Sequence, residues 1–137
     1  MNKIAVVFWS GTGNTEAMAA AVAEGAGPGA ELIPAAAFDP AALANYDGFA
    51  FGCPSMGAEQ LEESEFEPMF AACEAGLAGR RVGLFGSYGW GDGEWMRSWE
   101  ERCAAAGIAL AAPSVICCEA PDEDALAACR ALGAALA

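Results

Sequence analysis

Short apolar runs alternate along the chain with segments whose apolar residues recur at helical spacing. The runs at residues 3–9, 48–53 and 81–86 are almost continuously apolar, which is typical of strands that are buried on both faces of a sheet. Weaker strand patterns occur at residues 30–34 and 109–117. The pattern therefore predicts five strands.

Segments whose apolar residues have helical spacing lie between most of these strands. The first helix is predicted over residues 15–25, and its apolar positions include Met18, Ala21 and Val22. Three further helices follow from apolar residues spaced three or four positions apart: Phe66, Met69, Phe70, Cys73 and Leu77; Met96, Trp99 and Cys103; Leu126, Cys129, Leu132 and Leu136. Ser64 and Glu67 have the spacing of a capping box, and Pro121-Asp122 predicts the start of the last helix.

Strands that alternate with helices predict an α/β fold. Such a chain forms a doubly wound five-stranded parallel sheet with helices on both faces, because each crossover places its helix against the sheet. No linker, repeat or low-complexity segment interrupts the pattern beyond an enrichment in alanine. We therefore expect one domain over residues 1–137.

The charge balance is strongly acidic, with six Lys and Arg against nineteen Asp and Glu and a formal net charge of -13. Such a surface repels nucleic acids and anionic membranes and favours partner proteins with basic docking surfaces. No apolar stretch reaches the roughly 18 residues that span a bilayer. The first apolar run leads into a Gly/Thr loop without an Ala-x-Ala site, so we interpret it as a strand and not as a signal peptide.

The cysteine pattern argues against a metal site. None of the six cysteines forms a C-x-x-C pair, and the chain has no histidine, so a zinc or iron–sulfur site is not expected. Most of the six lie in predicted strands or on apolar helix faces, where a reduced thiol packs as a small hydrophobic group. This usage predicts a reducing compartment and hence a cytoplasmic location.

A glycine-rich loop joins the first predicted strand to the first helix. Its residues are Ser10, Gly11, Thr12, Gly13, Asn14 and Thr15. Backbone N–H groups converge at such a helix N-terminus, and the helix dipole attracts an anion. No Lys or Arg occurs from Ile4 to Pro54, and Glu16 stands where a dinucleotide fingerprint needs its third glycine. The loop therefore predicts a single phosphate monoester held by neutral donors, the alternative being a tight turn without a ligand.

Two more loops follow central strands at their carboxyl ends, where open α/β sheets bind ligands. One contains Pro54, Ser55, Met56, Gly57, Ala58 and Glu59, and the other contains Ser87, Tyr88, Gly89, Trp90 and Gly91. Glycines on both sides of Trp90 do not bury an indole, whereas a flat aromatic ligand covers one. Met56 offers a polarizable surface for the opposite face of such a ring. The alternative is that both side chains pack against each other or into the core.

Three segments of the chain together resemble the short-chain flavodoxins of anaerobic, clostridial-like bacteria. They read SGTGNTEAM, GCPSMGAEQLEESEFEP and LFGSYGWGDGEWM, and the resemblance extends over essentially the whole chain. It implies a sheet of strand order 2-1-3-4-5 that binds FMN at its switch point. It also implies an electron-transfer protein and not an enzyme: a low-potential one-electron carrier that shuttles between the semiquinone and hydroquinone of FMN and substitutes for ferredoxin.

The resemblance also implies roles for residues of all three loops. Ser10 to Thr15 hold the phosphate, Met56 and Trp90 sandwich the isoalloxazine, Gly57 and Ala58 lie beside its N5 edge, Glu59 accepts from N3–H, and Ser87, Tyr88, Gly89 and Gly91 line the pyrimidine side. The resemblance supports a site role for Glu119 less strongly, because relatives carry Asn at this position. The chain departs from some relatives at Pro54, which replaces Ser, and at Ala58, which replaces Asp or Ser.

Two expectations concern how the protein tunes the flavin. The Gly57 carbonyl accepts a hydrogen bond from N5–H of the semiquinone, because Gly57 takes the first central place of a type II′ turn over Met56–Glu59. Five carboxylates lie near this loop: Glu59, Glu62, Glu63, Glu65 and Glu67. They either lower the potential of the second electron or simply form a solvated helix face.

Two other functions fit the same fold. One is an FMN-dependent NAD(P)H:quinone oxidoreductase, although the chain has no long insertion to build a substrate pocket and no histidine for proton transfer. The other is a flavin-free module that binds phosphate or protein. For the electron carrier, the resemblance implies ferredoxin-type oxidoreductases or reductases as partners, and we expect a monomer.

Overall fold

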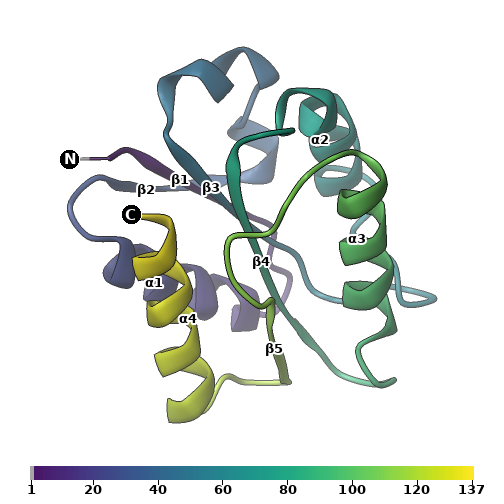
Figure 1. Ribbon diagram of the computed structural model, residues 1–137. Helices are drawn as coiled ribbons and strands as arrows, with labels where there is room; N and C mark the ends of the chain where they lie inside the picture. Colours follow the sequence, from purple (N-terminus) through teal and green to yellow (C-terminus); the bar gives the residue numbers. More distant parts are fainter. Residues whose placement is uncertain (1) are drawn as a thin grey trace.

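Five parallel strands form one sheet in the computed structural model, which describes residues 2–137 (Figure 1). The strands are β1 (Ile4–Phe8), β2 (Ala30–Pro34), β3 (Gly48–Gly52), β4 (Arg81–Tyr88) and β5 (Val115–Cys118). Their order is β2-β1-β3-β4-β5, and every neighbouring pair is parallel. This topology confirms the predicted doubly wound sheet. Residue 1 of the predicted domain lies outside the described residues.

Four α-helices cover the two faces of the sheet (Figure 1). They are α1 (Asn14–Ala26), α2 (Phe66–Cys73), α3 (Glu94–Ala105) and α4 (Glu123–Leu136), with short 3-10 turns η1 (Ala35–Ala37), η2 (Pro40–Asn45) and η3 (Glu74–Gly76). Helices α1 and α4 pack against each other on one face, whereas α2 and α3 lie on the other. No helix among residues 2–137 has both the length and the apolar character to cross a membrane.

Successive side chains of a strand point to opposite faces of the sheet, so each strand contributes to two separate cores. In β1, Ala5 and Val7 belong to the core under α2 and α3, while Ile4 and Val6 belong to the core under α1 and α4. The first core is aromatic: Phe51 meets Phe70 edge-to-face at 5.2 Å between ring centroids. The second core consists mainly of small and aliphatic side chains. The two faces are therefore packed by different kinds of residue.

Glycines allow helices α1 and α4 to approach each other closely. A Cβ atom on Gly133 would lie 2.0 Å from the Val22 carbonyl oxygen, and one on Gly25 would lie 1.9 Å from the Arg130 carbonyl oxygen. Backbone therefore meets backbone at both crossing points, and any side chain there forces the helices apart. This contact joins the two helices that cover one face of the sheet.

The last two strands end at other positions than the sequence pattern predicts. Strand β5 covers only Val115–Cys118 instead of residues 109–117, since Pro113 has no N–H to donate and Leu110 makes only an isolated bridge to Val82. Strand β4 continues to Tyr88, so Ser87 and Tyr88, predicted as loop residues, pair with β5. The site residues at the end of β4 are therefore held in the sheet.

Helix α2 lacks the predicted capping box. The Ser64 hydroxyl does not cap the helix, because it donates to the carboxylate of Glu62. That carboxylate accepts from the N–H groups of Glu65 and Phe66, both at 2.8 Å, so Glu62 caps the helix in place of Ser64. At the other end the helix stops at Cys73, and the turn η3 brings Leu77 into the core. By contrast, the predicted start of α4 is confirmed, since Asp122 accepts from Ala125 N–H at 2.8 Å.

Candidate functional site

A cavity of about 690 Å³ opens at the carboxyl ends of the strands, where the predicted loops meet. Its lining residues are Trp9, Gly11, Thr12, Asn14, Pro54, Ser55, Met56, Ser87, Tyr88, Gly89, Glu119 and Ala120. All three predicted loops and the segment after β5 contribute, and the volume lies within the roughly 300–1,000 Å³ of small-molecule sites. Ser10, Gly13, Thr15, Gly57, Ala58, Glu59, Trp90 and Gly91 are not among the lining residues.

Two lining residues escaped the sequence prediction, Trp9 and Ala120. Trp9 directly follows β1, and its indole N–H donates to Glu65 at 2.9 Å. Its ring also lies over Gly11, where a Cβ atom would be 3.1 Å from the indole. The position of Trp9 next to the glycine-rich loop is a sequence feature that could have identified it. Ala120 carries no such feature, since a lone alanine in a loop has no distinguishing chemistry.

The glycine-rich loop folds back on the first turn of α1. The Ser10 hydroxyl accepts from the N–H groups of Gly13 at 3.1 Å and Glu16 at 3.2 Å. Gly13 is the N-cap of the helix and has a φ of 96°, a left-handed conformation that favours glycine. Helix geometry leaves the first N–H groups of α1 without intrahelical acceptors. The loop therefore presents an electropositive helix end to the cavity.

Thr15 connects this loop to the sheet and does not face the cavity. Its side chain is fully buried, and its Oγ1 atom lies 3.2 Å from the Oγ atom of Ser87, which is also buried. The two hydroxyls share a hydrogen bond that ties the start of α1 to the end of β4. Thr15 is thus a residue of the loop that the structure places behind the cavity wall.

The hydroxyl of Ser55 is the clearest polar group without a partner at the site. Ser55 lines the cavity, its Oγ atom is buried, and no group of residues 2–137 forms a hydrogen bond with it. Its backbone N–H is held by the Ser87 carbonyl oxygen at 3.0 Å. A buried hydroxyl without a partner is costly unless a ligand satisfies it. The position of Ser55 therefore fits a polar ligand atom in the cavity.

The loop after β3 is a hairpin that closes one residue later than predicted. Met56 and Gln60 exchange two backbone hydrogen bonds of 2.8 Å, so the tip contains Gly57, Ala58 and Glu59. The predicted type II′ turn over Met56–Glu59 is wrong, because Gln60 N–H, and not Glu59 N–H, donates to the Met56 carbonyl oxygen. Glu59 itself adopts a positive φ of 56°. Gly57 does have the predicted positive φ, at 52°.

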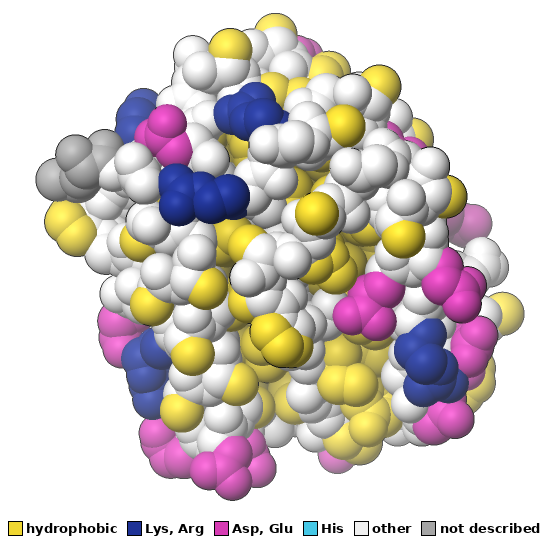
Figure 2. Space-filling view, viewed as in Figure 1, with side chains coloured by type: hydrophobic (Ala, Val, Ile, Leu, Met, Phe, Trp, Pro, Cys, Tyr) yellow, Lys and Arg dark blue, Asp and Glu magenta, His cyan; other side chains and the backbone are white. Residues whose placement is uncertain are grey.

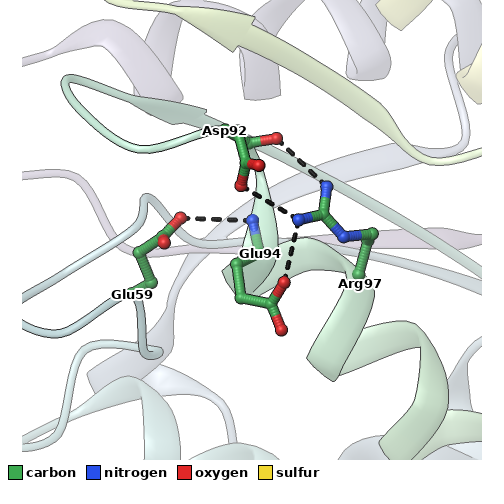
Figure 3. A network of polar contacts seen from close by, with 4 residues as sticks. All are labelled: Glu59, Asp92, Glu94 and Arg97. Atoms are coloured by element: carbon green, nitrogen blue, oxygen red, sulfur yellow. Dashed lines mark hydrogen bonds and ion pairs between the residues drawn. The ribbon is translucent and has the colours of Figure 1, made fainter.

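Glu59 links this hairpin to the loop that follows β4 (Figure 3). Its carboxylate accepts from Glu94 N–H at 3.1 Å, and Arg97 donates to Asp92 Oδ1 at 2.9 Å and to Glu94 Oε2 at 2.8 Å. Gly91 has a φ of 82°, which favours glycine, and a Cβ atom there would lie 2.6 Å from Glu59 Oε1. The bond between Glu59 and Glu94 therefore links the hairpin that carries Met56 to the segment that follows Trp90.

The two side chains predicted to sandwich a ring are open to solvent. Trp90 has 59% of its surface exposed and Met56 has 36%, and neither belongs to a core. Packing into the core, part of the alternative for these two residues, is therefore wrong. The segment after β5 is held near them, since Glu119 donates its N–H to the Tyr88 carbonyl oxygen at 2.7 Å and has a φ of 59°.

The predicted acidic cluster is not one solvated face. Glu62 is only 6% exposed, and Glu67 pairs with Arg102 at 2.7 Å. Burial alone would raise the pKa of Glu62, but hydrogen bonds from Ser64, Phe66 and Glu65 outweigh it and hold this pKa below its ordinary value. No Lys or Arg is among the residues that line the cavity. The cavity therefore offers neutral donors, and Glu119 is the one charged residue among those that line it.

The lowered pKa of Glu62 predicts how stability depends on pH. Because the folded-state pKa lies below the ordinary value of 4.5, the ionised form stabilises the fold fully above that pH and this contribution is lost on acidification. We expect Glu62→Gln to cost about 2 kcal/mol of unfolding free energy near neutral pH. In urea titrations the gap to the unsubstituted protein should close as the pH falls below 4.5 and Glu62 takes up a proton. A gap that does not change with pH would contradict the charged cap.

Comparison with known proteins shows which family this chain is similar to. The family model for flavodoxin matches residues 6–133. The chain is 42% identical over 137 residues to a flavodoxin of Megasphaera elsdenii, covering 98% of each chain, and 45% identical over 121 residues to one of Clostridium beijerinckii, covering 86% of this chain and 88% of that one. The solution structure of the two-electron-reduced M. elsdenii flavodoxin superposes with a TM-score of 0.87 at 41% identity, covering 97% of each chain. Together with the strand order and the cavity at the carboxyl edge of the sheet, these likenesses show that the chain belongs to the flavodoxin family, as an electron-transfer flavoprotein and not an enzyme.

Proposed function

We propose that the flavin is FMN and that the protein carries single electrons at low potential. The observation that carries this proposal is the cavity at the N-terminus of α1, whose glycine-rich wall contains Gly11, Thr12 and Asn14 and no Lys or Arg. Neutral N–H and hydroxyl donors at a helix N-terminus suit one phosphate monoester. A cofactor with a pyrophosphate, such as a dinucleotide, binds a G-x-G-x-x-G loop, and in this chain Glu16 occupies the position of the third glycine.

Each side of the cavity has a role in this proposal. The loop from Ser10 to Thr15 holds the phosphate. Thr12 and Asn14 contact it from the cavity wall, whereas Gly13 shapes the start of the helix and Thr15 fixes the loop to Ser87. The buried hydroxyl of Ser55 supplies the polar contact that it lacks within the chain. Bound FMN supplies the redox chemistry, because its ring accepts and releases electrons one at a time.

The flavin ring would be held by the two loops that Glu59 connects. We assign Met56 and Trp90 to its two faces, since both expose apolar surface, Met56 lines the cavity and Trp90 directly follows the lining residue Gly89. Gly57 and Ala58 would lie at one ring edge, and Glu59, which keeps Glu94 in place, would also accept from a ring N–H. Backbone groups complete the site, namely those of Ser87, Tyr88, Gly89 and Gly91, with Pro54 and Glu119 at its borders.

The charge distribution supports redox partners with basic docking surfaces. Figure 2 shows acidic side chains on both sides of an apolar area in the lower part of the view. A net charge of -13 steers basic proteins towards such a surface and accelerates their encounter at low salt. Ferredoxin-type oxidoreductases or reductases are the partners that we propose, with the protein acting as a cytoplasmic monomer of one domain.

The alternative function, an FMN-dependent NAD(P)H:quinone oxidoreductase, is not favoured. The curated relatives named above are flavodoxins. The ring face that a quinone would need is the face that we assign to Trp90. We therefore expect the loaded protein to reduce a quinone from NAD(P)H no faster than free FMN does.

The proposal is tested by titrating the apoprotein with FMN, riboflavin and FAD. We expect one FMN per chain, riboflavin binding weaker by at least about a hundredfold because it lacks the charge-assisted phosphate contacts, and little FAD binding. Potentiometry should then resolve two separate one-electron steps. Equal affinity for FMN and riboflavin, or a single two-electron step, would contradict the proposal.

A further inference from the structure

Among residues 2–137, Glu62 is the one acidic side chain that is buried. It lies directly after the Met56–Gln60 hairpin and before helix α2. A carboxylate at such a position is stable only when hydrogen-bond donors surround it. Its neighbour Glu63 has the same charge and is exposed. The two residues therefore differ in contacts although they are adjacent in sequence.

Donors from one short segment surround the Glu62 carboxylate. Oε1 accepts from Glu65 N–H and Phe66 N–H, each at 2.8 Å, and Oε2 accepts from Ser64 N–H at 2.9 Å and from the Ser64 hydroxyl. The backbone carbonyl oxygen of Glu62 accepts from Glu67 N–H at 2.8 Å. Charge-assisted hydrogen bonds are the stronger class. They fix the end of the hairpin to the start of α2.

The backbone N–H of Glu62 fixes the same residue to the sheet. It donates to the Sγ atom of Cys53 at 3.3 Å, and Cys53 is fully buried at the end of β3. Cys53 is itself held by Phe85, whose carbonyl oxygen lies 3.1 Å from Cys53 N, and by the Trp95 indole, which donates to the Cys53 carbonyl oxygen at 3.0 Å. Burial raises the pKa of the Cys53 thiol to about 12, so it stays protonated and neutral.

The segment from Cys53 to Glu62 is therefore closed at both of its ends. It contains the partnerless hydroxyl of Ser55 and the hairpin tip at Gly57. Gly57 at this tip is open to solvent space, since a Cβ atom there would meet nothing within 4 Å. Two anchors, at Cys53 and Glu62, hold the ends of this segment. Between them it is supported by the bond from Ser55 N–H to the Ser87 carbonyl oxygen and by the bond from Glu94 N–H to the Glu59 carboxylate.

We propose that Glu62 is a positioning residue for the flavin: its buried carboxylate anchors the hairpin in the geometry that binds the ring, and it does so through contacts and not through its charge at a distance. This inference rests on the proposed function, because it assigns Glu62 a part in the same site. If only a fraction of the apoprotein molecules has the hairpin in the binding geometry, the apparent affinity for the flavin is reduced in proportion to that fraction.

The experiment compares Glu62→Gln with Glu63→Gln, which removes the same charge one residue away. A glutamine at 62 keeps the shape but turns an NH₂ group towards backbone N–H donors and weakens the anchor. We expect Glu62→Gln to bind FMN about tenfold more weakly and Glu63→Gln to stay within about twofold. Ser64→Ala, which removes one donor of the same carboxylate, should give an intermediate loss.

A second readout does not need the flavin. Amide exchange at Met56 and Gln60 in the apoprotein reports on the two hydrogen bonds that close the hairpin. We expect faster exchange at both amides in Glu62→Gln and no change in Glu63→Gln. If FMN does not bind to the unsubstituted protein, the proposed function fails, whereas these amides still show whether Glu62 anchors the hairpin.

Equal effects of the two glutamine variants on affinity and on amide exchange would overturn the inference, since only charge would then matter. Loss of FMN affinity that high salt restores would overturn it too, because screening acts on charge and not on contacts. If Glu62→Gln does not fold, Ser64→Ala and Cys53→Ala test the two anchors separately, and wild-type exchange rates in both would contradict the proposal.

Discussion

Thr12→Asp is expected to weaken FMN binding by at least about a hundredfold while riboflavin binding changes by no more than about twofold. Thr12 lines the cavity and is exposed in the glycine-rich loop before α1. A carboxylate there competes for the same N–H groups and repels a phosphate that carries nearly two negative charges. Riboflavin has no phosphate and does not experience this repulsion. The measurement is fluorescence titration of the apoprotein with both flavins.

Two variants control for other effects of this substitution. Thr12→Asn has nearly the same size as the aspartate variant without its charge, and we expect it to retain FMN within about fivefold. Ala109→Asp adds one negative charge at an exposed residue in the loop between α3 and β5, and it should leave affinity for both flavins unchanged. If Thr12→Asp lowers the affinity for riboflavin as strongly as that for FMN, the phosphate does not bind at this loop.

Gly133→Ala is expected to destabilise the protein by about 3 kcal/mol, although alanine is the better helix former. In an exposed helix this exchange gains about 1 kcal/mol. Here the new Cβ atom would lie 2.0 Å from the Val22 carbonyl oxygen and 2.8 Å from the Ala26 nitrogen, both backbone atoms of α1. Neither atom can move without displacing the helix, so the crossing of α1 and α4 must open. We expect the melting temperature to fall by about 10 °C.

The matched control is Ala134→Gly, the reverse exchange one position further along α4. Ala134 is exposed, so it should follow helix propensity alone and cost about 1 kcal/mol. Gly25→Ala tests the second crossing point, where the Arg130 carbonyl oxygen lies 1.9 Å from the added atom, and it should behave like Gly133→Ala. Urea unfolding of the apoproteins measures all three. A Gly133→Ala protein as stable as the unsubstituted one would show that the helices do not approach this closely.

The strands and most of the helices follow from local patterns, and the exceptions have identifiable causes. Strand β5 is shorter than its apolar pattern because Pro113 removes a donor, and β4 is longer because Cys117 and Cys118 pair with its end. The capping box at Ser64 is wrong although its spacing is right. A carboxylate two residues earlier competes for the same N–H groups, and only the path of the chain brings Glu62 to them.

The site shows the same division between local and non-local information. A glycine-rich loop between a strand and a helix indicates an anion site from sequence alone, because its donors are backbone groups of neighbouring residues. The shared hydrogen bond between Thr15 and Ser87 spans 72 positions, and the link from Glu59 to Glu94 spans 35. No periodicity encodes such pairs, so the sequence could name these residues but not their partners.

The sequence by itself determined the order of strands and helices, the acidic surface and the chemistry of the three loops, because each depends on residues that are close along the chain. The tertiary structure decided which groups face the cavity, that the Ser55 hydroxyl has no partner in the chain, and that Glu62 is a buried cap instead of a surface charge. The physical reason is that burial and hydrogen bonding between distant residues arise only when the sheet brings its loops together.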